Sequence, residues 1–158
     1  MPKILPMTFD YKDKKLLVLL QNDSKKTTKQ LAAALDLSVT AVFERIKKLE
    51  KYEVIKKYVA LVDKGKLHKS FVVLCHVKLA QHKKQYIVQF ENEITQFPEV
   101  LECFHVSGDY DYILKICVAD ISEYRDFMVS KLTNLQHIAS TQSSFMIKEV
   151  KNSTVIEP

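Results

Sequence analysis

The stretch 27–57, TTKQLAAALDLSVTAVFERIKKLEKYEVIKK, combines short polar side chains with Arg and Lys at helical spacing. Short side chains near a helix N-terminus allow close approach to base edges, and longer basic ones reach bases or phosphates. The pattern therefore predicts a helix-turn-helix that places its second helix in the major groove of DNA. The residues of that helix and its cap that we expect to face DNA are Ser38, Val39, Thr40, Ala41, Glu44, Arg45 and Lys48.

The preceding helix offers candidates for gripping the DNA backbone. Thr27, Thr28 and Lys29 open this helix, whose N-terminal amides and lysine can hold a phosphate. On the second helix, Arg45 can reach either a guanine or a phosphate. Lys47 and Lys48 either contact the DNA backbone or are solvated. The competing interpretation is a solvated helix with a Lys-rich face, but two helices joined by a short turn favour DNA reading.

Polar caps and apolar spacing predict the helices that must position these side chains. Asp10 is an expected N-cap for a helix over 10–21, and Thr27 with Gln30 matches a capping box. Ser38 is an expected N-cap for a third helix over about 39–51. On that helix the positions that we expect to face the core, at i, i+4 and i+7, are Val42, Ile46 and Leu49.

The charge of the chain is unevenly distributed. Residues 1–66 carry 15 Lys or Arg and 8 Asp or Glu, whereas residues 67–158 carry 9 and 11, so the net charges are +7 and −2. A basic first half suits a polyanion such as DNA. The alternative is that the lysines only serve solubility.

The composition excludes several other classes of protein. The only glycines are Gly65 and Gly108, which rules out the Gly-rich phosphate loops of Rossmann and P-loop enzymes. Three widely spaced cysteines indicate reduced thiols in a cytoplasmic protein, and five histidines show no metal-binding spacing, so we expect no metal and no cofactor. We see no signal peptide and no apolar run of about 18 residues, and we expect no membrane partner. No nucleophile–base pair stands out, which argues against an enzyme.

Strand and helix patterns alternate in the second half, and the predicted class is α+β. The order β-α-β-β-α-β predicts a ferredoxin-like split motif, with two helices on one face of a four-stranded antiparallel sheet. We expect domain boundaries at 1–62 and 71–158, with a connector over 63–70. The expected segments are strand 71–79, helix 81–97, strand 100–106, strand 110–118, a helix capped by Asp120 and strand 138–150.

The first of these strands predicts an apolar surface on the side away from the helices. Phe71, Val73, Cys75 and Val77 alternate onto one face, so Val72 and Leu74 lie on the other. A face without helices should turn polar, and this one does not. A second copy of the same sheet is the simplest cover, and packing under the connector is the alternative.

With these motifs in order, the sequence resembles the Lrp/AsnC family of bacterial and archaeal transcription regulators, also called feast/famine regulators. The resemblance covers about residues 9–155. It rests on Asp10-x-x-Asp13-x-x-x-Leu17-x-x-Leu20, Leu31-Ala32 with Leu37-Ser38-x-Thr40, Arg45-x-x-x-Leu49, Val54-Ile55-x-x-Tyr58, Pro98-Glu99-Val100, Gly108-Asp109-Tyr110-Asp111-Tyr112, and Lys148-Glu149-Val150-Lys151-Asn152-Ser153-Thr154.

The resemblance implies a winged helix-turn-helix followed by a ligand-sensing domain of ferredoxin-like βαββαβ fold. It also implies homodimers formed through the sheets, often assembled into octamers, with a small amino acid bound near the Gly-Asp-Tyr-Asp loop. In that loop an Asp can accept from an ammonium and the backbone can offer amides to a carboxylate; the alternative is that it is only a hairpin turn. The expected ligand residues are Val106, Ser107, Gly108, Asp109, Tyr110, Asp111, Thr141 and Ser143.

Three positions depart from the family pattern. Val39 stands where Pro is usual, and Glu53 and His68 stand where Gly is usual. Gly at a helix end commonly takes a left-handed conformation, so the turn at Glu53 is the departure with a structural consequence.

The function that we expect is a sequence-specific transcription regulator switched by a small amino acid. One alternative is an effector-independent architectural DNA-binding protein. Another is a small ferredoxin-like enzyme, but the scarcity of glycine and the lack of a catalytic residue set argue against it.

Overall fold

The computed structural model describes residues 8–158, which form two compact units. The first unit contains the chain up to Leu61 together with Lys151–Pro158, and the second contains Val62–Val150. The expected boundaries differ at both junctions, because the connector over 63–70 lies in the second unit and the last eight residues lie in the first. Each unit has a hydrophobic core of its own.

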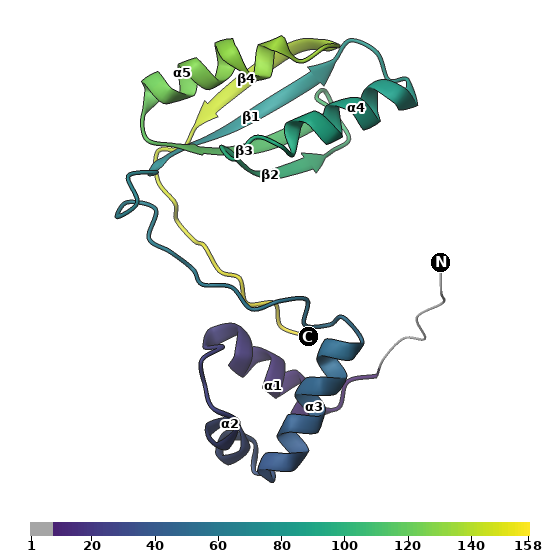
Figure 1. Cartoon of the computed structure of the whole chain (residues 1–158), viewed down its shortest axis with the longest axis vertical. Coiled ribbons are helices and arrows are strands. Elements are labelled where there is room, and N and C mark those ends of the chain that lie inside the picture. Colours follow the sequence, from purple (N-terminus) through teal and green to yellow (C-terminus); the bar gives the residue numbers. More distant parts are fainter. Residues whose placement is uncertain (1–7) are drawn as a thin grey trace. The chain divides into compact units, whose positions relative to one another are not determined.

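Three helices with polar caps form the first unit: α1 (Tyr11–Asn22), α2 (Thr28–Leu35) and α3 (Val39–Lys51) (Figure 1). Asp10 and Asp13 form a capping box at α1, Thr27 and Gln30 form one at α2, and the Ser38 hydroxyl accepts from the Ala41 amide at α3. The three predicted caps are confirmed. Each satisfies backbone amides that have no partner within the helix.

The apolar stripes of these helices share one core. Leu16, Leu31, Leu35, Val42 and Leu49 are each at most 1% exposed. Ile46, the remaining predicted core position of α3, packs against this cluster and is partly buried. The core fixes α3 so that its opposite face is solvent-exposed.

The segment after α3 lacks the strands that a wing would need. Within the described chain, residues 52–70 contain turns and irregular backbone but no β-strand. The amides of Val54 and Ile55 instead donate to the Leu49 carbonyl, which closes the end of α3. The chain can make this turn because Glu53 adopts a left-handed φ of 56°. His68, the other position where Gly is usual, adopts a left-handed φ of 53°. Both positions therefore keep the conformation that favours glycine.

Replacing Glu53 by Gly should stabilise the first unit. Glu53→Gly removes the clash of Cβ with the backbone in the left-handed region but adds freedom to the unfolded chain, so we expect a net gain of about 0.5–1 kcal/mol. The measurement is urea unfolding. As a matched control, Lys48→Gly inside α3 should instead lose about 1 kcal/mol. Equal destabilisation by both changes would show that Glu53 is not strained.

The second unit has the predicted βαββαβ order. Its sheet runs β2-β3-β1-β4 with every neighbouring pair antiparallel (Figure 1). The last strand ends five residues earlier than expected, and the residues that follow it are irregular. The elements are β1 (Phe71–Leu79), α4 (Lys84–Ile94), β2 (Val100–His105), β3 (Tyr112–Val118), α5 (Ile121–Ser130), the short 3-10 helix η1 (Leu132–Asn134) and β4 (Ile138–Phe145).

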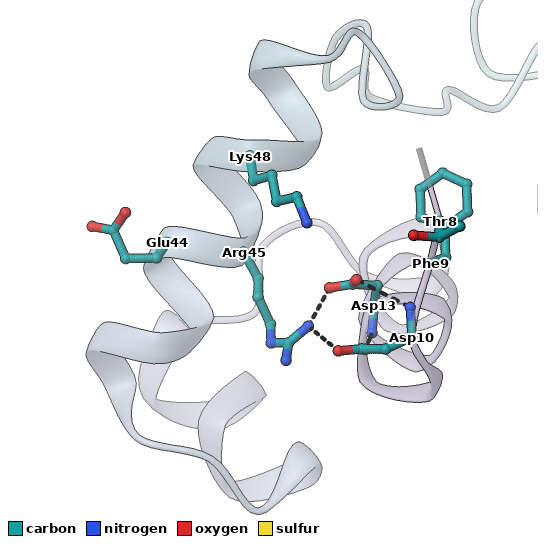
Figure 2. Close-up of a pocket in the computed structure, with 7 residues that line it drawn as sticks. All are labelled: Thr8, Phe9, Asp10, Asp13, Glu44, Arg45 and Lys48. Atoms are coloured by element: carbon teal, nitrogen blue, oxygen red, sulfur yellow. Dashed lines mark hydrogen bonds and ion pairs between the residues drawn. The ribbon is translucent and has the colours of Figure 1, made fainter. Parts of the chain in front are cut away.

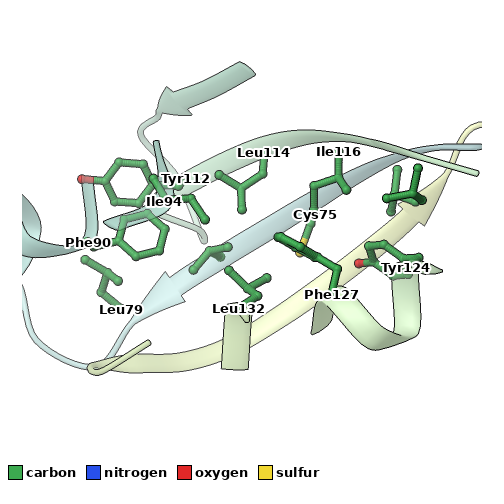
Figure 3. Close-up of a cluster of buried hydrophobic side chains, with 13 residues drawn as sticks. Cys75, Leu79, Phe90, Ile94, Tyr112, Leu114, Ile116, Tyr124, Phe127 and Leu132 are labelled. Atoms are coloured by element: carbon green, nitrogen blue, oxygen red, sulfur yellow. The ribbon is translucent and has the colours of Figure 1, made fainter. Parts of the chain in front are cut away.

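The core of this unit lies between the sheet and its two helices (Figure 3). Val73, Cys75 and Val77 of β1 are fully buried there, as the alternation predicted. Phe90 and Ile94 of α4 close one end of the core. The cysteines are free thiols, and burial raises the pKa of Cys75, so it is a packing residue rather than a nucleophile.

The opposite sheet face remains apolar in part, and no helix in the described residues of this unit covers it. Leu74 is 36% exposed and pairs across strands with Lys115, and Phe104 on the edge strand β2 is half exposed beside Ile113. Val72 of the same face is buried. The predicted apolar face is therefore present within the unit.

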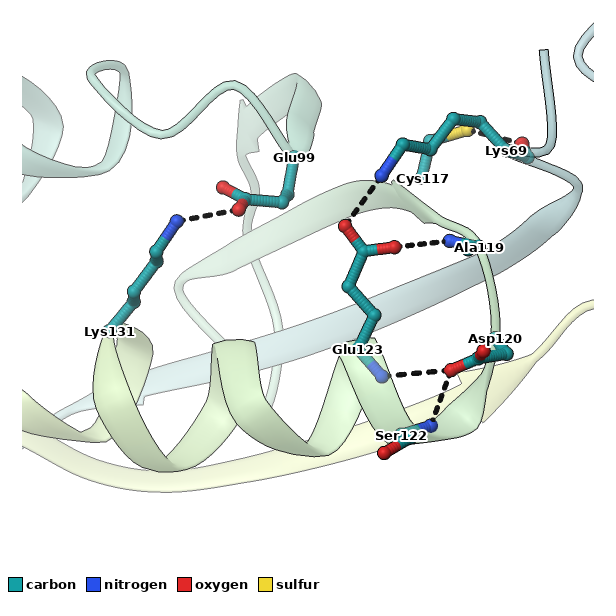
Figure 4. Close-up of polar contacts among 8 residues, drawn as sticks. All are labelled: Lys69, Glu99, Cys117, Ala119, Asp120, Ser122, Glu123 and Lys131. Carbon is teal, nitrogen blue, oxygen red and sulfur yellow. Dashed lines mark hydrogen bonds and ion pairs between the residues drawn. The ribbon is translucent and has the colours of Figure 1, made fainter.

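Backbone hydrogen bonds and one ion pair hold the first turn of α5 (Figure 4). Asp120 caps the helix by accepting from the amides of Ser122 and Glu123. The Glu123 carboxylate accepts from Lys69 Nζ at 2.5 Å and from the Ala119 amide at 2.6 Å.

Among the described residues, none of the helices is both long enough and apolar enough to span a membrane.

Candidate functional site

The exposed face of α3 carries most of the residues predicted to meet DNA. Ser38, Val39, Thr40, Glu44 and Lys48 are exposed, and Ala41 is half-buried. Thr40 and Glu44 lie one turn apart on the side opposite the buried Val42 and Leu49. This part of the predicted surface is therefore free to approach a partner.

Arg45 takes a different position from its neighbours on α3. Its Nη1 lies 2.8 Å from Asp10 Oδ2 and 2.5 Å from Asp13 Oδ1 (Figure 2). Asp13 is only 3% exposed, whereas the Arg45 side chain is 27% exposed. Hydrogen bonds from the Asp13 backbone amide and from Arg45 lower the pKa of Asp10. The hydrogen bond to Asp13 raises the pKa of Arg45. In this geometry the guanidinium joins α3 to the start of α1, and its predicted contact with DNA stays a prediction.

A shallow pocket of about 580 Å³ lies beside this ion-pair cluster. Glu44 points away from the cluster, whereas the Lys48 ammonium lies over the start of α1 (Figure 2). The pocket wall is mixed in charge and therefore offers no separate anion site. Its lining residues are Thr8, Phe9, Asp10, Asp13, Glu44, Arg45 and Lys48.

The start of α2 is only partly available to a phosphate. The Thr27 hydroxyl accepts from the Gln30 amide, and the Gln30 carboxamide oxygen accepts from the Thr27 amide at 2.8 Å. Thr28 is half-buried and Lys29 is exposed. Of the three predicted backbone contacts, Thr27 and Lys29 are exposed, and the Thr27 hydroxyl is already bonded to the Gln30 amide.

Sequence reasoning omitted Phe43, a large exposed residue of α3. Its side chain is 47% exposed, and Lys47 Nζ lies 5.7 Å from the ring centroid. Position 43 follows Thr40 at i+3, so the helical spacing itself places it next to the predicted surface. The spacing was therefore the signal that could have found it.

The predicted effector loop turns between β2 and β3 at Gly108, whose φ is 133°. The Val106 amide donates to the Asp111 carbonyl at 2.8 Å, and the Asp111 amide donates to the Val77 carbonyl at 2.9 Å. A Cβ at Gly108 would meet no atom within 4 Å, so no neighbouring atom requires a glycine here. The positive φ is what favours glycine at this position. Ser107 and Asp109 at the tip are exposed.

Asp111 anchors this loop through its carboxylate. Oδ2 accepts from the Leu79 amide at 2.7 Å, and Oδ1 lies 2.8 Å from His82 Nε2. Burial raises the pKa of Asp111, but the Leu79 amide and His82 outweigh it, and the net pKa is below the ordinary value of 3.8. Asp111 is thus occupied by its own chain, which leaves Asp109 as the more accessible acceptor.

Replacing Asp111 by Asn should loosen this anchor in a pH-dependent way. A carboxylate with a lowered pKa stabilises the folded state above its unfolded pKa, and this stabilisation disappears as the pH falls through the folded value. We expect Asp111→Asn to cost about 1 kcal/mol at pH 7 and less as the pH falls below 3.8. Thermal unfolding of both proteins between pH 3 and 7 measures this. A deficit that does not change with pH would contradict the assignment.

The remaining predicted ligand residues do not all converge on the loop. Tyr110 Oη donates to the Gln142 side chain at 2.6 Å. Thr141 pairs with Val77, whose carbonyl holds the loop, whereas the Ser143 hydroxyl lies 2.5 Å from Tyr124 Oη under the helices. Thr141 is therefore near the base of the loop, and Ser143 faces the helix-covered core.

Comparisons with known proteins decide the family. A family described as "Lrp/AsnC ligand binding domain" matches residues 72–156, and "Winged helix-turn-helix DNA-binding" matches residues 9–56. The chain belongs to the Lrp/AsnC family. It is 33% identical to the Bkd operon transcriptional regulator of Pseudomonas aeruginosa, with 87% of this chain and 90% of that protein covered.

Further Lrp/AsnC relatives support the same assignment. The leucine-responsive regulatory protein of Haemophilus influenzae is 35% identical, with 91% of this chain and 87% of that protein covered. A transcriptional regulator of Neisseria meningitidis, solved in complex with L-Met, superposes with a TM-score of 0.91 at 28% identity, with 94% of this chain and 96% of that one covered. The chain is thus a DNA-binding transcription regulator with a ligand-binding domain, and not an enzyme.

Proposed function

We propose that this protein reads a specific DNA sequence with α3, and that its second unit senses a small amino acid and assembles into homodimers and larger oligomers, including octamers. The observation that carries the proposal is the exposed face of α3, where Thr40 and Glu44 lie opposite the buried side. Exposed Lys48 and Lys29 add positive charge for phosphates. Such a protein acts in the compartment that holds the DNA, which for a bacterial or archaeal regulator is the cytoplasm.

The open face of the sheet supports the proposed homodimer. Leu74 and Phe104 expose apolar area where an antiparallel sheet with helices on one side would otherwise be polar. A second copy of the same face covers this area symmetrically. Two copies of α3 would then prefer a roughly palindromic site.

The effector that we propose is an amino acid held at the loop over 106–111. The exposed Asp109 carboxylate can accept from an ammonium, and the backbone around Gly108 can donate to a carboxylate. The L-Met complex of the Neisseria meningitidis relative supports this class of ligand. A ligand that binds one oligomer or one spacing of the DNA-binding units better than another shifts the population towards it.

Two measurements on the full-length protein test the proposal. Binding to duplex DNA should weaken steeply between about 50 and 200 mM salt, because phosphate contacts release counterions. A thermal-shift screen against the twenty amino acids, each at millimolar concentration, should give a hit, since a ligand at about 100 times its Kd adds about 2.7 kcal/mol. A thermal shift that Asp109→Ala abolishes would support the loop over 106–111 as the effector site. DNA binding that does not depend on salt would contradict the proposed phosphate contacts.

One observation favours an alternative, an effector-independent architectural protein. Asp111 and Ser143 are already bonded within the chain, to Leu79, His82 and Tyr124, so part of the expected ligand set is occupied. Such a protein would bend or wrap DNA without a ligand. The absence of any amino-acid hit, together with salt-sensitive DNA binding, would favour this alternative.

A further inference from the structure

The exposed face of α3 carries two large apolar side chains among its polar ones. Val39 and Phe43 lie one turn apart and are 49% and 47% exposed. Thr40, Phe43, Glu44 and Lys47 follow the i, i+3, i+4, i+7 spacing of one helix face, and all four are exposed. The apolar pair therefore borders the side chains proposed to meet base edges.

The Phe43 ring lies beside a cation and is not among the side chains that pack against the core of this unit. Lys47 Nζ lies 5.7 Å from the ring centroid and 3.0 Å from Glu50 Oε2. Val42 and Leu49 fill the core with no exposed area, so the ring of Phe43 adds little to packing. A cation beside an aromatic ring orients it, and here the ring is oriented on a basic surface.

The chemistry of this surface matches one group in the major groove. Among the base edges displayed there, only thymine presents an apolar methyl group, and Phe and aliphatic side chains recognise it by contact. The basic residues Lys47 and Lys51 on the same helix suit the neighbouring phosphates. We propose that Phe43, together with Val39, determines specificity by recognising thymine methyl groups; this inference rests on the proposed DNA-binding function.

A second copy of this chain is a poorer occupant of the same surface. Lys47, Lys48 and Lys51 share α3 with Phe43 and are all exposed. Glu44 is the one exposed carboxylate of α3 beside these three lysines, so two copies meeting through this face would bring mostly like charges together, whereas DNA brings phosphates to them. The charge therefore selects the nucleic acid as the partner of the apolar pair.

The test uses the full-length protein and a duplex that the wild type selects from a random library. Each thymine is replaced in turn by deoxyuridine, which removes the methyl group and preserves base pairing. We expect about fourfold weaker binding by the wild type for each contacted methyl that is lost. The Phe43→Ala variant should bind the thymine and deoxyuridine duplexes equally well at one or more of those positions, and the positions that stay sensitive are the ones that Val39 contacts.

Two further variants show whether the thymine preference belongs to the Phe43 ring. Val129→Ala, at a 64% exposed position of α5, should keep the wild-type preference for thymine, and Phe43→Leu should keep part of it. The wild-type comparison of thymine with deoxyuridine needs no variant, so it does not depend on how Phe43→Ala folds.

Several results would overturn the proposal. Equal wild-type binding to all substituted duplexes would do so, as would a Phe43→Ala protein that keeps the full wild-type preference for thymine at every one of these positions. A changed oligomeric mass of Phe43→Ala with an unchanged thymine preference would assign the ring to a protein contact instead. A wild type that selects no duplex at all would remove the proposed reading of a specific DNA sequence, and this inference with it.

Discussion

Arg45→Ala should destabilise the first unit by about 3 kcal/mol in urea unfolding at pH 7. The substitution leaves the Asp13 carboxylate, only 3% exposed, without its cation, and removing one partner of a buried ion pair costs several kcal/mol. It also removes the link between α3 and the start of α1. We expect DNA affinity to fall near the unfolding transition of the variant, where less protein is folded, and to stay close to that of the wild type well below this temperature.

Two matched variants make this result interpretable. Lys48→Ala, on the same helix and exposed, should change the free energy of unfolding by less than about 0.5 kcal/mol. Combining Arg45→Ala with Asp13→Ala should recover part of the loss, because no buried charge is then left unpaired. An Arg45→Ala protein that is fully stable but loses affinity for one base pair would instead make Arg45 a base reader, which is one of the two DNA contacts that the sequence allows.

Leu74→Lys should convert the proposed homodimer into monomers. The change places an ammonium in the middle of the open sheet face, directly across from Lys115, and a second copy would bury both charges. We expect the Kd of the dimer to rise at least 100-fold, which corresponds to about 2.7 kcal/mol. Sedimentation equilibrium over a range of protein concentrations measures it.

The control for this change lies on the other side of the sheet. Val88→Lys on the outer face of α4, at a 44% exposed position, should leave the oligomeric state unchanged. The far-UV circular dichroism of Leu74→Lys should also stay that of the wild type, because Leu74 is already partly exposed. A Leu74→Lys protein that remains dimeric would move the interface away from this face.

The sequence by itself determined the features that depend on neighbouring residues. Caps such as Thr27 with Gln30 act between positions three residues apart, so the residue types alone predict them. Strand alternation in β1 likewise separated Val73 from Leu74, because successive side chains point to opposite faces. The order of the elements then predicted the ferredoxin-like sheet, and the landmarks in that order predicted the family.

The site residues were predicted less completely, because exposure of a side chain depends on what packs beside it. Arg45 and Glu44 are adjacent in sequence, yet one is bonded to Asp13, 32 residues away, and the other points to solvent. Asp111 is similarly occupied by Leu79 and His82. Residue type and spacing cannot rank such neighbours when the deciding partner is distant in the chain.

Only the tertiary structure decided how the ends of the two units are organised. The resemblance implied a winged unit without placing its backbone, and the structure closes the end of α3 with a turn at Glu53, where the amides of Val54 and Ile55 bond back to Leu49. Within the first unit the Gln21 side chain both donates to and accepts from the backbone of Ile156, 135 residues away. Local propensity carries no information about a pairing at that separation, since only the folded chain brings the two segments together.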